Sequence, residues 1–259
     1  MDAGPLDFLP LWTMCLATIA VGLLSVEAGY RLGILRRRRS EPETESSVGI
    51  MGAAALGLLA FTLAFTFALA ATHLDARQQF MADEAIAIRT TYLRSAFLPE
   101  PQRSTFRDIL RGYLETRLEA AQSGKWELAG PQRLHARLWA EAGAAVQNEP
   151  TSVLAGLFIE SLNEVINLHA KRVQATLRSR IPGVIWATLY FVASLAMAGI
   201  GYHEGLTSRR RSPALVIVVL TFSAVIYLIA DLDRPQQGLF NVSQQAMVDL
   251  RNFLDETSR

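Results

Sequence analysis

The sequence predicts an all-α membrane protein with four transmembrane helices and a helical extramembrane domain inserted between the second and the third. One observation is the presence of four uncharged apolar stretches, at residues 8–26, 48–72, 181–202 and 213–230. Each is close to the roughly 20 residues that a helix needs to cross hydrocarbon, where every backbone polar group must be bonded within its own segment. The other observation is a polar stretch with helical periodicity, residues 73–180, which separates the two pairs of apolar stretches.

These boundaries divide the chain into four parts. The parts are a first transmembrane helix pair (1–72), a helical extramembrane domain (73–180), a second transmembrane helix pair (181–230) and a C-terminal segment with a short amphipathic helix (231–259). No stretch alternates with period two strongly enough to predict a strand.

The overall charge and the cysteine count exclude several classes of protein. The chain has 259 residues, of which 51% are hydrophobic, and a formal net charge of +1, so its charge balance does not indicate a nucleic-acid partner. Its single cysteine, Cys15, cannot form a disulfide or a cysteine metal cluster within one chain. The four histidines are scattered without metal-ligand spacing, so we expect neither a metal nor another cofactor.

The first apolar stretch is predicted to be a retained membrane helix. Residues 1–7 contain no Lys or Arg, which a cleaved signal peptide would carry there. The helix is expected to continue past the membrane, because Glu27 and Arg31 have the four-residue spacing of a helical ion pair. Small residues mark one face of this helix: Gly22, Ser25, Gly29 and Gly33.

The second apolar stretch combines two residue patterns. Small residues recur along it at helical spacing and form a predicted helix-packing stripe: Gly49, Ala53, Gly57, Ala60, Ala64 and Ala68. Such stripes let membrane helices approach closely, so we expect this helix to be buried among neighbours. An adjacent face carries candidate pore-lining residues: Leu58, Phe61, Thr62, Phe65, Thr66 and Leu69. Ordinary helix packing, with the threonines bonded to their own backbone, is the alternative interpretation.

The polar insert is predicted to contain only helices, because apolar residues recur along it at helical spacing. The predicted helices cover residues 76–97, 106–118, 132–147 and 152–180. Pro99 and Pro101 end the first of these helices, and Pro182 marks a kink or junction before the third span.

Charged residues follow the fourth span directly. The sequence there is Asp231-Leu-Asp-Arg-Pro235, and a short amphipathic helix is predicted at residues 244–254. Asp231 and Asp233 would attract cations at a pore mouth, or they would cap the helix end together with Arg234. Both interpretations stay open.

A second group of charges is predicted on the helix that leaves the second span. Its members are Glu84, Arg89 and Arg94, and Glu84 is expected to pair with Arg172 or Arg178 of the helix at 152–180. A structural ion-pair network is the default interpretation. Together with Asp231, Asp233 and Arg234 these residues form the candidate charged cluster of the chain.

Basic residues at the membrane edges predict an orientation. Arg36–Arg39 follow the first span and Arg209–Arg211 join the last two, so the positive-inside rule places both short loops in the cytoplasm of a bacterial inner membrane. The insert and the C-terminus are then outside. Basic residues of the insert near the membrane, among them Arg77 and Arg172, argue for the opposite orientation unless a long domain is translocated regardless of charge.

Signatures of catalysis are missing from the sequence. There is no GxSxG elbow, no phosphate-binding glycine loop and no HExxH, so the chain is not expected to be an enzyme. A distant alternative is an enzyme that acts on lipid or envelope substrates through Glu84, Asp231 and Asp233.

Three segments are distinctive as a set. They are Leu56–Phe67, Glu84–Arg94, and Asp231–Pro235 with Gly238 and Val242-Ser243. Together they resemble the bacterial bestrophin-like domain family, and the resemblance covers nearly the whole chain. The sequence departs from the family pattern at Ile86 and Ile88, where smaller or polar residues are usual.

This resemblance implies a distant likeness to bestrophins, which are homo-oligomeric anion channels whose second membrane helix lines a hydrophobic neck. Phe61 and Phe65, with Leu58 or Leu69 a turn away, would then form the constriction, and the hydroxyls of Thr62 and Thr66 would replace part of an ion's hydration shell. It also implies a cytoplasmic helical region, opposite to the placement from charge.

The leading hypothesis is therefore a homo-oligomeric membrane channel or pore that conducts ions. Its partners would be the lipid bilayer, further copies of the chain, and ions. The alternative is a membrane-anchored sensor or scaffold whose helical domain binds a partner or ligand.

Overall fold

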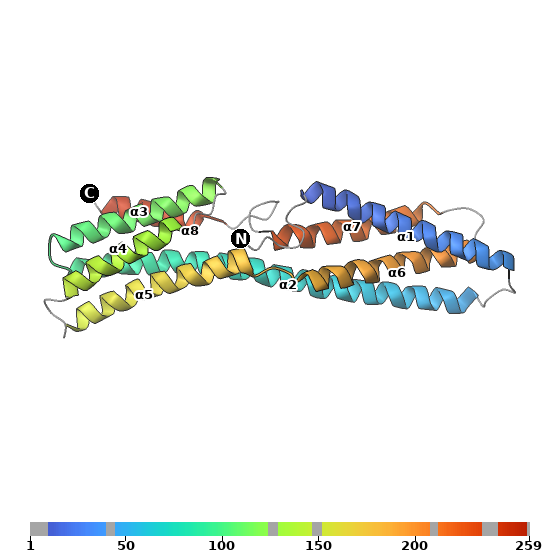
Figure 1. Cartoon of the computed structure of the whole chain (residues 1–259), viewed down its shortest axis with the longest axis horizontal. Helices are drawn as coiled ribbons and strands as arrows, with labels where there is room; N and C mark the ends of the chain where they lie inside the picture. The colour runs from blue at the N-terminus through green and yellow to red at the C-terminus, as the bar shows by residue number, and fades with distance from the viewer. Residues whose placement is uncertain are drawn as a thin grey trace. The chain divides into compact units, whose positions relative to one another are not determined.

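The computed structural model describes residues 10–39, 45–123, 129–146, 152–207, 212–234 and 243–257. Every regular element in these residues is a helix, which confirms the all-α class (Figure 1). The α-helices are α1 (Leu11–Arg39), α2 (Glu45–Arg94), α3 (Gln102–Ser123), α4 (Ala129–Val146), α5 (Val153–Val173), α6 (Gly183–Thr207), α7 (Ala214–Asp233) and α8 (Gln245–Thr257). Some positions that support the predictions above lie outside the described residues: Arg209–Arg211, Pro235, Gly238 and Val242.

Four helices in the described part of the chain are long and apolar enough to cross a membrane: α1, α2, α6 and α7. They contain the predicted span 48–72 and cover most of the spans predicted at 8–26, 181–202 and 213–230. As expected, α1 continues past its apolar stretch, and Arg31 Nε lies 2.7 Å from Glu27 Oε1 one turn away.

The chain folds into two compact units. The membrane unit comprises Met1–Leu74 and Ser179–Asn241, and the helical unit comprises Asp75–Arg178 and Val242–Arg259. Helix α2 contributes residues to both. The segment 231–259, predicted as one part, is divided between the units, because α7 ends in the membrane unit and α8 belongs to the helical unit.

Glycines bring α1 and α6 of the membrane unit into backbone contact. A Cβ added at any of four glycines would overlap a backbone carbonyl of the facing helix: Gly29 on Ala198, Gly33 on Tyr202, Gly201 on Val26 and Gly205 on Tyr30. Small residues at such crossings allow the close packing on which membrane helices depend. The small-residue face predicted on the first span therefore meets the glycine pair of the third.

The core of the helical unit is built from apolar side chains of α2, α3, α4, α5 and α8. The rings of Phe106 and Phe158 meet edge to face, with centroids 4.9 Å apart. Helix α8 lies against α3 and buries three side chains in this core, Met247, Leu250 and Leu254 (Figure 1).

The long helix predicted at 152–180 is interrupted before Pro182. Helix α5 ends at Val173, a π-helical turn continues from Gln174 to Arg178, and α6 begins at Gly183. Proline explains the interruption, because it lacks an amide hydrogen and disfavours helical backbone in the residue before it. In the π-helical turn the Ala175 carbonyl accepts a hydrogen bond from Arg77 Nε at 3.1 Å.

Candidate functional site

An exposed apolar face on α2 is the candidate functional site in the membrane unit. The side chains of Leu58, Phe61 and Phe65 are 56%, 70% and 65% exposed. They project from the side of α2 opposite to Leu59 and Leu63, which are buried against the other helices of the membrane unit. Three of the six predicted pore-lining residues thus contact little else in the chain.

The predicted helix-packing stripe lies on the same outward side. Ala53, Gly57, Ala60, Ala64 and Ala68 are all exposed, and a Cβ added at Gly57 would meet nothing within 4 Å. Gly49, the first residue of the stripe, is half-buried. A Cβ added to it would lie 3.4 Å from the ring of His203 in α6. The chain's own helices therefore do not pack on most of this stripe, and they contact the opposite face of α2 instead.

The remaining predicted pore-lining residues lie nearer to the interior of the chain. Thr62 and Leu69 are half-buried and Thr66 is 1% exposed. The hydroxyls of Thr62 and Thr66 donate to the carbonyls of Leu58 and Thr62, each at 2.8 Å. Their bonding to their own helix matches the alternative interpretation given for these threonines.

A buried ion-pair network occupies the centre of the helical unit. Glu84 of α2 is fully buried, and its Oε2 lies 2.6 Å from Arg172 Nε of α5. Its Oε1 lies 3.5 Å from Arg117 Nε of α3 and accepts a hydrogen bond from the Tyr113 hydroxyl. The pairing of Glu84 with Arg172 is the one that the sequence predicts. The side chain of Arg178, the other predicted partner, is outside the described residues.

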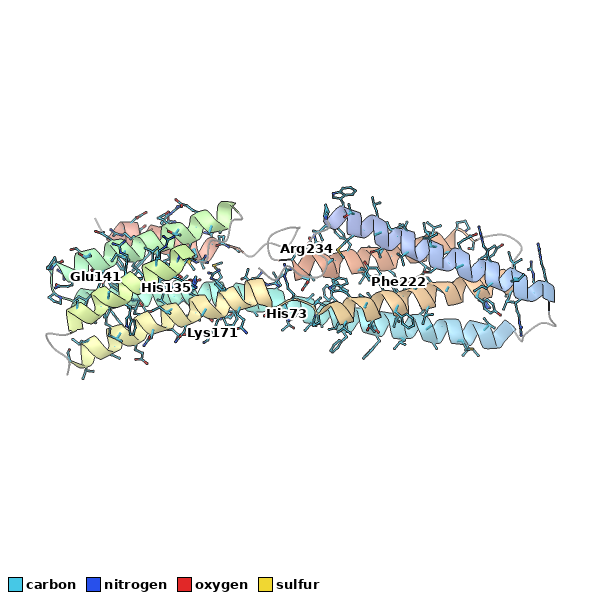
Figure 2. All side chains as sticks on the ribbon, viewed as in Figure 1. His73, His135, Glu141, Lys171, Phe222 and Arg234 are labelled. Carbon is cyan, nitrogen blue, oxygen red and sulfur yellow. The ribbon has the colours of Figure 1, made fainter. Side chains whose placement is uncertain are left out.

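Two histidines complete this network. His169 Nδ1 lies 3.0 Å from the Tyr113 hydroxyl and 3.3 Å from Arg172 Nη2. His135 of α4 meets the His169 ring edge to face, with centroids 4.7 Å apart, and its place on α4 is labelled in Figure 2. In the described residues no group of three or more His, Cys, Asp or Glu side chains could hold a metal ion.

Burial determines the protonation of the groups around Glu84. Burial and then the neighbouring Glu84 carboxylate raise the pKa of Tyr113 well above its usual value. Burial lowers the pKa of Arg172, and Glu84 acts in the opposite direction. Burial, followed by the nearby His169, lowers the pKa of His135 to about 4. At neutral pH the network therefore holds a neutral tyrosine and a neutral His135.

Sequence reasoning did not identify Tyr113, Arg117, His135 and His169 as members of this network. A signal was present, because Tyr113 and Arg117 are four residues apart on an apolar helical stripe, where a polar side chain needs a buried partner. The sequence does not state which helix supplies that partner.

The other members of the candidate charged cluster do not join Glu84. The Arg89 guanidinium lies 4.1 Å from the ring centre of Phe253 in α8, and Arg94 Nη1 donates to the Leu157 carbonyl at 2.6 Å. Each therefore fastens α2 to a different helix of the helical unit.

The residues at the end of α7 form a separate, buried group in the membrane unit. Asp231, Asp233 and Arg234 are 0%, 7% and 5% exposed. Asp233 Oδ1 accepts a hydrogen bond from the Ile181 amide at 3.0 Å, and Arg180 donates to the Asp233 carbonyl. Arg234, labelled in Figure 2, places Nη2 3.3 Å from Met14 Sδ of α1. These contacts tie the segment before α6 to the end of α7, as a structural cap does.

Comparisons with known proteins agree with this architecture. The model of the Bestrophin-like domain matches residues 16–247. The crystal structure of a bacterial bestrophin homologue from Klebsiella pneumoniae, carrying one substitution, has a TM-score of 0.67 at 15% sequence identity and covers 96% of this chain and 99% of that one. The crystal structure of a membrane protein, also a single-substitution variant, has a TM-score of 0.62 at 16% identity and covers 96% and 99%. At these identities the likeness concerns the fold alone. No curated protein matches the sequence.

Proposed function

Because this chain belongs to the Bestrophin-like domain family, whose model matches residues 16–247, we propose that it forms a homo-oligomeric membrane channel that conducts ions. In this proposal α2 of each copy contributes to the wall of a shared pore. The observation that carries it is the outward face of α2, where aromatic and small side chains are exposed together.

Exposed small residues on a membrane helix indicate a surface that packs against another protein helix. Lipid tails are as apolar as leucine, so helices in a membrane associate through close packing rather than through the hydrophobic effect. Ala60, Ala64 and Ala68 form a small-residue surface of this kind, and it is exposed rather than packed against another helix of the same chain. We therefore assign them, with Gly57 and Ala53, to contacts with the next copy.

The larger exposed side chains of α2 suit a constriction. In a ring of copies, Leu58, Phe61 and Phe65 would repeat around the axis and form a hydrophobic neck that gates by dewetting. Thr62 and Leu69 are half-buried and border this face. Thr66 is buried on the side of α2 that packs within the chain.

Reconstitution into liposomes tests the proposal. The double substitution Phe61→Ala and Phe65→Ala widens the expected constriction and should raise ion flux; a barrier lower by about 1.4 kcal/mol gives about a tenfold increase. Phe191→Ala is the matched control, because Phe191 of α6 is 64% exposed but lies on another helix. Equal flux in the double variant, or an assembled wild-type protein that passes no ions, would contradict the proposal.

A further inference from the structure

A groove runs between α2 and α5 on the surface of the helical unit. It has a volume of about 480 Å³. Its walls come from both helices: Asp83, Ile86, Ala87, Thr90 and Arg94 on α2, and Glu160, Ser161, Glu164 and Leu168 on α5.

Acidic and apolar side chains line the groove together. Glu160 and Glu164 are exposed, and among the described residues the structure gives neither carboxylate an ion-pair partner. Ile86, on the α2 side of the groove, is 63% exposed, which is high for an isoleucine in a folded helical unit. Arg94 also lines the groove, and its Nη1 donates a hydrogen bond to the Leu157 carbonyl.

Helix α4 presents a surface of complementary character. On its inner side, His135, Leu138 and Ala142 are buried. Its outer side carries arginines, a tryptophan and small residues, all exposed: Arg133, Ala136, Arg137, Trp139, Ala140 and Gly143. Trp139 is 43% exposed, and a Cβ added at Gly143 would meet nothing within 4 Å.

The spacing of charges on the two surfaces agrees. Arg133 and Arg137 are four residues apart on α4, and Glu160 and Glu164 are four residues apart on α5. Residues at this spacing project from the same side of a helix, about 5–6 Å apart, so two arginines can meet two glutamates in register. Arginine and tryptophan are also the side chains most enriched at the centres of protein interfaces.

We propose that the outer face of α4 in one copy docks into the α2–α5 groove of the next copy. Arg137 pairs with Glu164, and Arg133, which also has an interaction within its own chain, pairs with Glu160. Trp139 covers the exposed Ile86. The contact joins two different surfaces, so it is head to tail and builds a ring when the rotation closes. This inference rests on the proposed function, because it names a contact within the proposed homo-oligomer.

Cross-linking between two differently tagged full-length chains tests the contact directly. Both carry Cys15→Ser, one also carries Arg137→Cys and the other Glu164→Cys, and they are co-expressed and oxidised in the membrane. A disulfide-linked heterodimer carrying both tags is expected, because only contact between copies can join the two cysteines. If the assembled protein yields no such species, the docking proposal is wrong.

Charge reversal supplies the second readout. In the cross-linking pair, Glu160→Arg places like charge opposite Arg133, and like charges across an interface repel each other, so the yield should fall by about tenfold or more. Adding Arg133→Glu to the other chain should restore it. Glu115→Arg with Glu119→Arg is the matched control, since these exposed carboxylates have the same spacing on α3.

The outcomes separate this inference from the proposed function. A wild-type protein that is monomeric by mass photometry in nanodiscs contradicts both proposals. An assembled wild-type protein whose cross-link is absent, or is unaffected by charge reversal, contradicts the docking of α4 alone and leaves the groove to a different basic partner.

Discussion

At the scale of single residues, Glu84 joins several helices of the helical unit. Its carboxylate contacts Arg172 of α5 and both Tyr113 and Arg117 of α3, so one side chain joins three helices. Burying charge is expensive, and this site offsets the cost by giving both carboxylate oxygens charged or hydroxyl partners. Loss of one partner would leave uncompensated charge in the core.

His135 gives the helical unit a predictable response to acid. It is 8% exposed, faces Tyr113 and His169, and its pKa is lowered to about 4, whereas a histidine in the unfolded chain has a pKa of about 6.5. A lowered histidine pKa means that the unfolded chain binds the proton more tightly. The neutral ring therefore contributes stability above pH about 6.5, and this contribution is lost as the pH falls toward 4.

His135→Phe tests this response, because phenylalanine keeps a ring against His169 but does not titrate. The wild-type protein should lose up to about 3 kcal/mol more unfolding free energy than the variant between pH 7 and pH 4. Thermal unfolding followed by circular dichroism over a pH series measures the difference. Parallel pH profiles for the two proteins would show that His135 is not responsible.

At this scale the sequence predicted only part of the site. The pairing of Glu84 with Arg172 was predictable, because both residues lie on helices with clear periodicity. Tyr113 and His135 were not, because helical periodicity shows that a residue faces inward without showing which residue it meets. The same limit explains why Arg89 and Arg94, grouped with Glu84 by sequence, contact α8 and α5 separately.

At the scale of helices, two glycines on the same element differ in their surroundings. Gly201 of α6 lies against the Val26 carbonyl of α1, whereas a Cβ at Gly199 would meet nothing within 4 Å. Gly201→Ala should push α1 and α6 apart and lower the unfolding temperature. Gly199→Ala should be neutral or stabilising by up to about 1 kcal/mol, because alanine favours helix.

Thermal unfolding of both alanine variants in the same detergent measures this contrast. A similar unfolding temperature for Gly201→Ala and the wild-type protein would indicate that the α1–α6 contact does not need glycine.

The helices themselves were largely predictable from hydrophobic periodicity, but their packing partners were not. The sequence contains small-residue stripes on both the first and the second span. The first packs against α6 within the chain, where Gly29 meets Ala198 and Gly33 meets Tyr202 and Gly205, whereas most of the second is exposed. A stripe shows that a close neighbour is needed, and it does not show whether that neighbour belongs to the same chain.

At the scale of the whole molecule, the charge distribution predicts how the chain is oriented in the membrane. Arg36–Arg39 end α1, and the positive-inside rule places them in the cytoplasm and the helical unit outside. Single cysteines at Arg37 and at Asn163, which is exposed on α5, report the two sides in a Cys15→Ser background.

An impermeant maleimide applied to intact spheroplasts should then label Arg37→Cys only after lysis and Asn163→Cys before it. The reverse labelling would contradict the orientation from charge and place the helical unit in the cytoplasm, as the resemblance to bestrophins implies.

Helix α8 has a consequence for how the protein is made. The helical unit takes most of its chain from residues before the third span, yet Met247, Leu250 and Leu254 of α8 complete its core from beyond the fourth. These apolar residues are still missing until both of those spans have been synthesised. The apolar surface that α8 covers in the folded unit therefore stays open for that interval, and a chain that stops before α8 presents it to chaperones and proteases.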